Sequence, residues 1–98
     1  MKIKFTANAV KWFDRINGNT YHSVNITNNE TGDIIYCEWT YGYGEYYRQT
    51  ALIAMAKANW LPGYTEENCF SYERENEYPI QWNVTNGLKR EMVANGRK

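Results

Sequence analysis

The segment Trp39–Gln49 is the most informative for the fold, and in one-letter code it reads WTYGYGEYYRQ. One tryptophan and four tyrosines surround two glycines, where a strand-like pattern gives way to a helical one. Glycine lets a chain turn sharply or approach a partner closely. Tyrosine offers a large rigid surface and a hydroxyl group at low entropic cost. We therefore expect a strand-to-helix corner that presents a binding surface.

The residues before this corner predict three antiparallel strands. Ile3 and Phe5 alternate with lysines, a half-buried pattern that continues unevenly toward Phe13. Asn17–Asn19, with the sequence NGN, is a strong hairpin signal because Asn and Gly tolerate positive φ. The second and third strands are expected at Thr20–Thr27 and Ile34–Thr40.

The residues after the corner predict one main helix from Glu45 to about Asn59. This stretch has no Gly or Pro, and its apolar side chains recur at helical spacing. The expected inner stripe consists of Tyr47, Ala51, Ala54, Met55 and Ala58. Pro62-Gly63 is expected to end the helix.

The last third of the chain predicts a loop that packs against the rest of the domain, followed by a fourth strand. Residues 63–79 are polar and acidic but contain four aromatic side chains, which indicate attachment to the body. Ile80 and Trp82 alternate with polar residues in a strand pattern. Residues 86–98 fit either a strand or a helix. The predicted fold is α+β with the order β-β-β-α-β, in which one main helix packs on one face of an antiparallel sheet.

Length and charge limit the classes of function. The chain has 98 residues, of which 43% are hydrophobic and 16% aromatic, so residues 1–98 should form a single domain. Eleven basic residues balance eleven acidic ones, so the net positive charge typical of nonspecific nucleic-acid binding is missing. Residues 61–80 are acidic and residues 81–98 are basic. These segments either form solvated surface or pair with each other, within one chain or across a dimer.

The sequence predicts a cytoplasmic protein without a membrane segment. The N-terminus lacks an apolar run long enough for a signal peptide, and no segment approaches membrane-spanning length. Cys37 and Cys69 do not form a CxxC motif. Cys37 is expected to be a buried thiol in this setting, and a disulfide between the two cysteines is left open.

No pattern in the chain indicates catalysis, a metal site or a cofactor. His22 is the only histidine, and Ser23 beside it should point to the opposite face of its strand, which breaks a catalytic dyad. One histidine and two distant cysteines do not match a zinc site, and the acidic residues lack calcium-loop spacing. We therefore predict a protein that is not an enzyme and binds neither metal nor cofactor.

Two arrangements would change that prediction. The YGYG segment at Tyr41–Gly44 precedes a helix, as phosphate-binding loops do, but it lacks the lysine and the third glycine of the known motifs. A pocket assembled in the tertiary structure from His22, Tyr36 and Glu38 would support a small enzyme or a ligand carrier.

The predicted partner-binding residues cluster at the strand-to-helix corner and on the neighbouring strand. Tyr and Arg are enriched at interface hot spots, and the corner tyrosines cannot all face the core. The alternative is that these rings cap the open end of the sheet. The predicted set is Tyr41, Tyr43, Tyr46, Arg48, Tyr21 and His22.

Two segments resemble a signature of short uncharacterised phage and prophage proteins. They are NGNTYHS at Asn17–Ser23 and YGYGEYYRQTA at Tyr41–Ala51, and the resemblance covers about the first sixty residues. It implies a mobile-element setting in a host cell, where small proteins often bind and block or adapt a host protein. It implies no catalytic residue.

The favoured hypothesis is a small protein-binding module of phage or prophage origin, for example an inhibitor of a host defence or regulatory protein. Its partner would be a host protein or a second copy of the chain, as in a homodimer. The alternative is a nucleic-acid-binding domain that uses the three-stranded sheet and the basic C-terminal tail.

Overall fold

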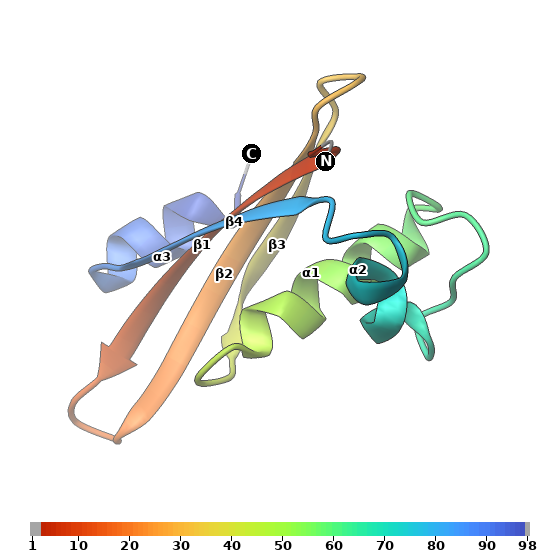
Figure 1. Cartoon of the computed structure of the whole chain (residues 1–98). Coiled ribbons are helices and arrows are strands. Elements are labelled where there is room, and N and C mark those ends of the chain that lie inside the picture. The colour runs from red at the N-terminus through yellow and green to blue at the C-terminus, as the bar shows by residue number, and fades with distance from the viewer. Residues whose placement is uncertain (1–2, 98) are drawn as a thin grey trace.

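The computed structural model describes residues 3–97 and shows an α+β fold with a four-stranded sheet (Figure 1). The strands and helices, in chain order, are β1 (Phe5–Asp14), β2 (Asn19–Asn28), β3 (Ile34–Tyr41), α1 (Tyr46–Lys57), the 3₁₀ helix η1 (Cys69–Ser71), α2 (Tyr72–Glu75), β4 (Ile80–Asn86) and α3 (Lys89–Asn95). The expected order of three strands, a main helix and a fourth strand is present. The C-terminal segment, left open by the sequence, forms a helix.

The sheet is mixed rather than antiparallel. Its strand order is β3-β2-β1-β4, so β3 and β4 are the two edges. β1 pairs antiparallel with β2, and β2 pairs antiparallel with β3. β4 instead runs parallel to β1, with Phe5 opposite Ile80. The prediction of a fully antiparallel sheet was therefore wrong at its fourth strand.

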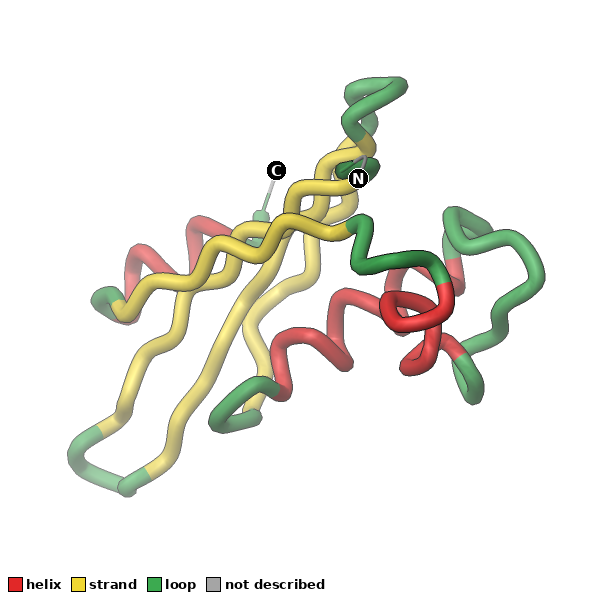
Figure 2. Tube along the Cα trace, viewed as in Figure 1, coloured by secondary structure: helices red, strands yellow, loops and turns green. Residues whose placement is uncertain are grey.

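The long connection between β3 and β4 explains this parallel pairing. A tight turn would have returned the chain antiparallel to β3, whereas a crossover through a helix lets the next strand run in the same direction. Here α1 and residues 58–79 carry the chain across the sheet to the far edge, beside β1 (Figure 2). The direction of β4 follows from this crossover and not from the alternation within the strand.

The hydrophobic core lies between one face of the sheet and α1. Phe5, Ala7 and Ala9 of β1 and Val24 and Ile26 of β2 are buried there. The buried residues of α1 are Tyr47, Ala51, Leu52, Met55 and Ala56. Alanines on this stripe let the helix approach the sheet closely, as expected. The buried stripe differs from the predicted one, because Leu52 and Ala56 are also buried and the predicted Ala58 is exposed.

Helix α1 ends at a left-handed asparagine and not at Pro62-Gly63. Asn59 has φ 60°, a conformation that Asn tolerates better than most residues. The amide of Asn59 donates to the carbonyl of Ala56, and the amide of Trp60 donates to Met55 at 2.9 Å. These two bonds form a Schellman-type cap, with asparagine where glycine is usual.

The opposite face of the sheet carries a polar patch that α3 covers. Successive strand residues point to opposite faces, so Ser23 and Asn25 face away from the core that contains Val24. The Ser23 hydroxyl donates to the carbonyl of Met92, and Asn25 Nδ2 donates to the carbonyl of Asn95 at 3.0 Å. Asn95 Nδ2 in turn donates to the carbonyl of Asn8 at 3.0 Å. Figure 1 shows α1 and α3 on opposite sides of the sheet.

The acidic segment 63–79 is attached to the body, as its aromatic side chains indicate. It contains η1 and α2, and Tyr72 is buried. The carboxylate of Glu73 accepts a hydrogen bond from Trp82 Nε1 at 2.8 Å. The two cysteines are free and buried, and burial raises the pKa of Cys37 to about 11. Among residues 3–97, no helix is long and apolar enough to cross a membrane.

Gly96 provides a test of how α3 docks. A Cβ at this position would lie 2.5 Å from the Cys37 carbonyl oxygen and 2.9 Å from Ser23 Cβ. Gly96→Ala should therefore lower the free energy of unfolding by about 1–3 kcal/mol, because the helix must move away from β3. Urea denaturation measures the change. Arg97→Ala, at an exposed neighbour, is the control and should stay within about 0.5 kcal/mol of wild type. Equal stability of all three proteins would contradict this packing.

Candidate functional site

The corner between β3 and α1 is built around two glycines with different roles. Gly42 is buried, and a Cβ there would come within 2.8 Å of both His22 Cε1 and Tyr46 Cδ1. Only glycine lets the backbone pass beneath these two rings. Gly44 has φ 63°, a left-handed conformation that other residues adopt at a cost. The turn therefore needs one glycine for space and the other for backbone conformation.

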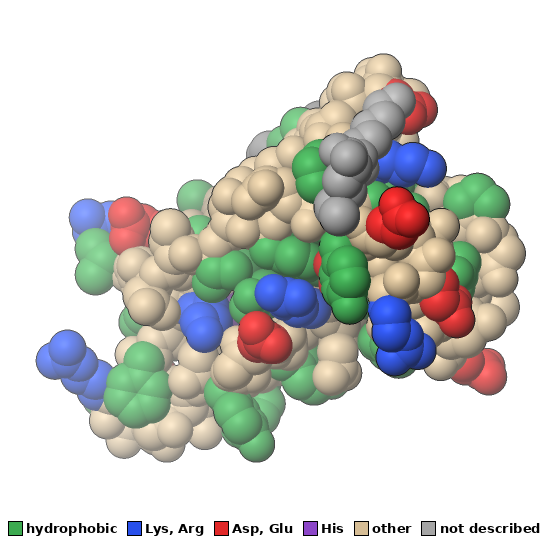
Figure 3. Space-filling model, in the orientation of Figure 1, with side chains coloured by type: hydrophobic (Ala, Val, Ile, Leu, Met, Phe, Trp, Pro, Cys, Tyr) green, Lys and Arg blue, Asp and Glu red, His purple; other side chains and the backbone are tan. Residues whose placement is uncertain are grey.

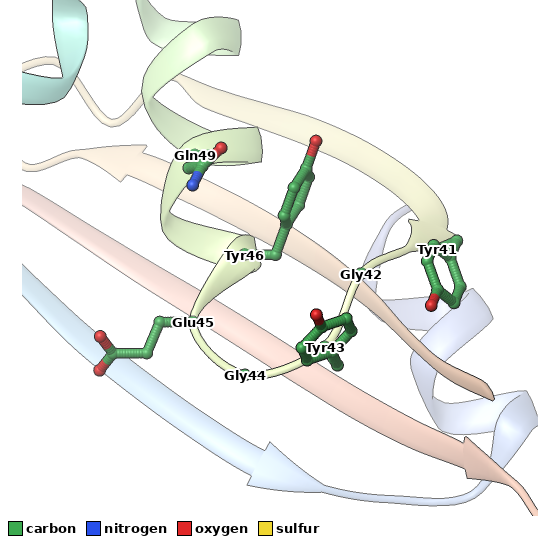
Figure 4. A pocket seen from close by; sticks show the side chains of 7 residues that line it. All are labelled: Tyr41, Gly42, Tyr43, Gly44, Glu45, Tyr46 and Gln49. Atoms are coloured by element: carbon green, nitrogen blue, oxygen red, sulfur yellow. The ribbon is translucent and has the colours of Figure 1, made fainter. Parts of the chain in front are cut away.

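Three tyrosines at this corner project into solvent. The exposed fractions are 53% for Tyr41, 70% for Tyr43 and 48% for Tyr46. Together with Glu45, Gln49 and the two glycines they line a pocket of about 530 Å³, the corner pocket (Figure 4). Tyr41 and Tyr43 meet edge to face, with ring centroids 6.5 Å apart. The rings thus remain available at the surface, as the binding hypothesis requires, and do not cap the sheet from inside.

His22 lies directly behind this pocket and is completely buried. Its Nδ1 is 3.1 Å from the carbonyl oxygen of Gly42, and its Nε2 is 2.8 Å from the hydroxyl of Thr50. A carbonyl can only accept, so Nδ1 carries the proton and Nε2 accepts from Thr50. The ring therefore ties β2 to the corner loop and to α1.

This environment favours the neutral imidazole. Burial lowers the pKa of His22 below its ordinary value, the hydrogen bond to Gly42 opposes that effect, and the charge of Lys11 adds to the lowering. Both ring nitrogens are engaged, so neither is available as a general base. The ring also has no exposed surface, so it supports the corner pocket from within and does not itself contact a partner in this conformation.

Arg48 points to the opposite flank of α1 from the corner pocket. Its guanidinium lies over the ring of Trp82, 5.2 Å from the centroid, and it reaches the carboxylates of Glu45 at 3.7 Å and Glu73 at 4.0 Å. These contacts attach the acidic segment to α1 and β4. The position of Arg48 in the sequence, close to Tyr46 and Tyr47, did not indicate that its side chain lies on the other flank of the helix from Tyr46.

Tyr21 belongs to a second aromatic surface on the face of the sheet that α3 covers. Its ring stacks on Trp12 at 5.7 Å and meets Trp39 and Tyr41 edge to face at 5.5 and 5.8 Å. We call Trp12, Tyr21, Trp39 and Tyr41 the aromatic row. Lys89 of α3 lies over Trp12, 5.5 Å from its ring centroid.

A register shift in β3 places Trp39 in this row. Val24 pairs with Cys37, but His22 pairs with Thr40, so β3 contains one extra residue between these pairs. Such a β-bulge reverses the alternation of side chains beyond it. Trp39 consequently shares a face with Tyr21, whereas strict alternation would have placed it with the buried Cys37. Tyr36 pairs with Asn25 on the α3 side and His22 lies on the other face, so these two side chains do not share a pocket with Glu38.

The six predicted residues thus occupy four places. Tyr41, Tyr43 and Tyr46 share the corner pocket, and Tyr21 joins Tyr41 in the aromatic row. His22 is buried behind the corner, and Arg48 lies on the far flank of α1. Sequence reasoning missed Trp12 and Trp39. The NGN signal alone did not give the pairing of Trp12 with Tyr21, because Trp12 lies five residues before that segment and Tyr21 two residues after it, and the observed register pairs Asp14 with Asn19.

The end of the β1–β2 hairpin forms a further exposed surface. Figure 2 shows this end reaching beyond both α1 and α3. Phe13, Ile16 and Leu88 are 54%, 94% and 52% exposed, beside a depression of about 820 Å³ that also includes Lys11 and Arg15. Within residues 3–97, no three His, Cys, Asp or Glu side chains lie close enough together to hold a metal ion.

Comparison with protein-family models, curated proteins and solved structures found no match for this chain.

The buried His22 predicts a specific dependence of stability on pH. Its pKa is lowered on folding, so its contribution is present above the unfolded value of about 6.5 and is lost as the pH falls below it. The free energy of unfolding should thus decrease between pH 7.5 and pH 5.5, and denaturant titrations across that range measure it. His22→Gln, which cannot become protonated, should flatten this part of the profile. An identical slope in wild type and variant would show that His22 is not responsible.

Proposed function

We propose that this protein is a non-enzymatic protein-binding module and that its partner contacts the corner tyrosines Tyr41, Tyr43 and Tyr46. The observation that carries the proposal is their exposure, between 48% and 70%, around a single pocket. Side chains of this type bury large areas with little loss of rotamer entropy, which makes them effective anchors in protein interfaces.

The support beneath these rings favours the same function. Tyr46 packs against His22, with ring centroids 5.9 Å apart, and His22 is held by two hydrogen bonds. A surface that is rigid before binding loses less entropy when a partner arrives. Figure 3 shows further hydrophobic side chains exposed next to the hairpin end and the start of α1. Exposed apolar surface of this kind is typical of interaction sites.

The resemblance of Asn17–Ser23 and Tyr41–Ala51 to phage and prophage proteins supports a more specific proposal. The partner would be a host protein, for example a defence or regulatory protein in the host cytoplasm, which the module inhibits or adapts. A homodimer formed through the same tyrosines is the other partner within this proposal. Neither form requires a cofactor.

The double substitution Tyr43→Ala with Tyr46→Ala tests the proposal. It removes two exposed rings, so the fold should survive while partner affinity falls by at least about tenfold, as expected for the loss of hot-spot residues. Affinity capture from host lysate, quantified by mass spectrometry against wild type, measures the loss. Sedimentation velocity of both proteins measures self-association at the same surface.

A matched control is available at Phe70, which is 47% exposed on η1, away from the corner. Phe70→Ala should capture the same proteins as wild type. Unchanged capture and unchanged oligomeric state in the tyrosine double variant, with a native circular dichroism spectrum, would refute the proposed site.

The aromatic row supports a second candidate function, binding of single-stranded nucleic acid. Aromatic side chains on a sheet face are used by such proteins to stack bases. Here the row spans β1, β2 and β3, and Lys89 lies over its Trp12 end. The balanced net charge and the edge-to-face contacts within the row argue for the protein-binding function first.

A salt titration distinguishes the two functions. If the row binds nucleic acid, the affinity for a fluorescein-labelled 12-nucleotide strand should fall steeply between 50 and 200 mM salt, because phosphate contacts release counterions. Trp39→Ala should weaken it further. Fluorescence anisotropy measures both effects. No change in anisotropy at 50 mM salt would exclude this candidate.

A further inference from the structure

The edge of β3 connects two pockets. The corner pocket lies at its C-terminal end, and a second pocket of about 510 Å³ lies at its N-terminal end, lined by Gly32, Asp33, Ile34, Tyr36 and Trp60. Trp60 follows the end of α1, so each end of the helix contributes to one pocket. Between the pockets, β3 has no neighbouring strand on its outer side within the described chain.

This edge lacks two of the features that commonly block strand addition. Lysine and proline commonly protect exposed edges, but Ile34–Tyr41 contains neither. Ile34, Tyr36 and Trp39 are 45%, 36% and 40% exposed. The bulge near Trp39 interrupts the strand toward one end and leaves regular pairing at Ile34–Cys37. An extended segment of another protein can therefore pair with this edge.

The charged residues of β3 and of the two pocket linings are all acidic, while the basic Arg97 follows Gly96, which lies against Glu38. Asp33, Glu38 and Glu45 are exposed, and they lie before, within and after β3; no lysine or arginine lines either pocket or belongs to β3. The Glu38 side chain has no hydrogen-bond or ion-pair partner among residues 3–97. A positively charged group of a partner would therefore complement this surface.

A second property of the corner pocket, its aromatic lining, also favours binding of a cation. Tyrosine rings attract ammonium and guanidinium groups through their electron-rich faces, and several rings around one pocket form an aromatic cage. Tyr41, Tyr43 and Tyr46 line this pocket, and Glu45 lies at its rim with its carboxylate, 75% exposed, turned away from the rings (Figure 4).

Two basic residues approach the corner from outside without filling it. Lys11 Nζ donates to the carbonyl oxygen of Gly44 at 3.2 Å, and Arg48 reaches Glu45 at 3.7 Å from the flank of α1. Neither lines the pocket. The contact of Arg48 is at the long end of the ion-pair range and exposed, so it neutralises Glu45 only weakly.

We infer that the partner presents an extended basic segment, which pairs with the edge of β3 and inserts a lysine or arginine side chain between the corner tyrosines. The inference rests on the proposed protein-binding function and specifies the chemistry of the partner. Antiparallel addition, the slightly more stable arrangement, places the N-terminal end of the segment beside the corner pocket. The eight residues of β3 span about 26 Å, room for a segment of similar length.

Two synthetic peptides that differ in one group test this inference on the full chain. Each is an acetylated and amidated octapeptide of alternating Thr and Val, in which the first Val is replaced by lysine or by norleucine. Norleucine has a similar chain and no ammonium group. Titration into ¹⁵N-labelled protein, followed by ¹H–¹⁵N spectra, gives both the affinity and the residues involved.

The lysine peptide should bind about tenfold more tightly than the norleucine peptide, as expected for a partly desolvated cation–π contact. It should shift the amide signals of Tyr43, Tyr46, Ile34 and Tyr36. Glu45→Gln should lower the affinity for the lysine peptide about threefold and leave the affinity for the norleucine peptide unchanged. Phe70→Ala should bind both peptides as wild type does.

Equal affinity of the two peptides for wild-type protein would overturn the inference, as would failure of both to bind at millimolar concentration. Shifts confined to α3, Trp12 and Tyr21 would also overturn it. The proposed function fails separately, when the Tyr43→Ala and Tyr46→Ala protein captures the same partners as wild type. If partner capture depends on these tyrosines but the two peptides bind equally, only the inferred basic segment is refuted and the proposed protein-binding function stands.

Discussion

The arrangement of the candidate surface depends on one buried ring. His22 bridges the Gly42 carbonyl and the Thr50 hydroxyl, so it connects the central strand β2, the corner loop and the second turn of α1. The neutral tautomer satisfies both bonds at once, and the absence of a side chain at Gly42 leaves the loop close enough to form them. The corner tyrosines therefore project from a loop whose backbone is held from below.

The two faces of the sheet are stabilised by different interactions. On the α1 side, apolar side chains and the alanines of the helix form the core. On the α3 side, hydrogen bonds among Ser23, Asn25, Asn95 and the backbone accompany the buried Met92. A polar interface of this kind tolerates little misplacement because its buried donors need their partners. The absence of a side chain at Gly96 lets α3 lie close enough to the sheet to form these bonds.

Exposure and support occur together at the binding surface. The corner tyrosines are largely in solvent, while the residues immediately beneath them are buried and hydrogen-bonded. This combination is typical of recognition surfaces that are organised before a partner binds. Arg48, by contrast, is occupied by Trp82 and Glu73 in holding the acidic segment, which explains why a residue type common at hot spots does not join the site here.

The sequence by itself determined the local elements, because alternation, helical spacing and turn residues act over a few positions. The three N-terminal strands, the NGN hairpin, α1 and the exposed tyrosines of the YGYG segment could be read in this way. The tertiary structure alone decided the parallel direction of β4, which depends on a crossover, and the placement of Trp39, which depends on a bulge between two strands. It also buried His22 and turned Arg48 away from Tyr46. Those outcomes depend on contacts between segments far apart in the chain, and local patterns do not record them.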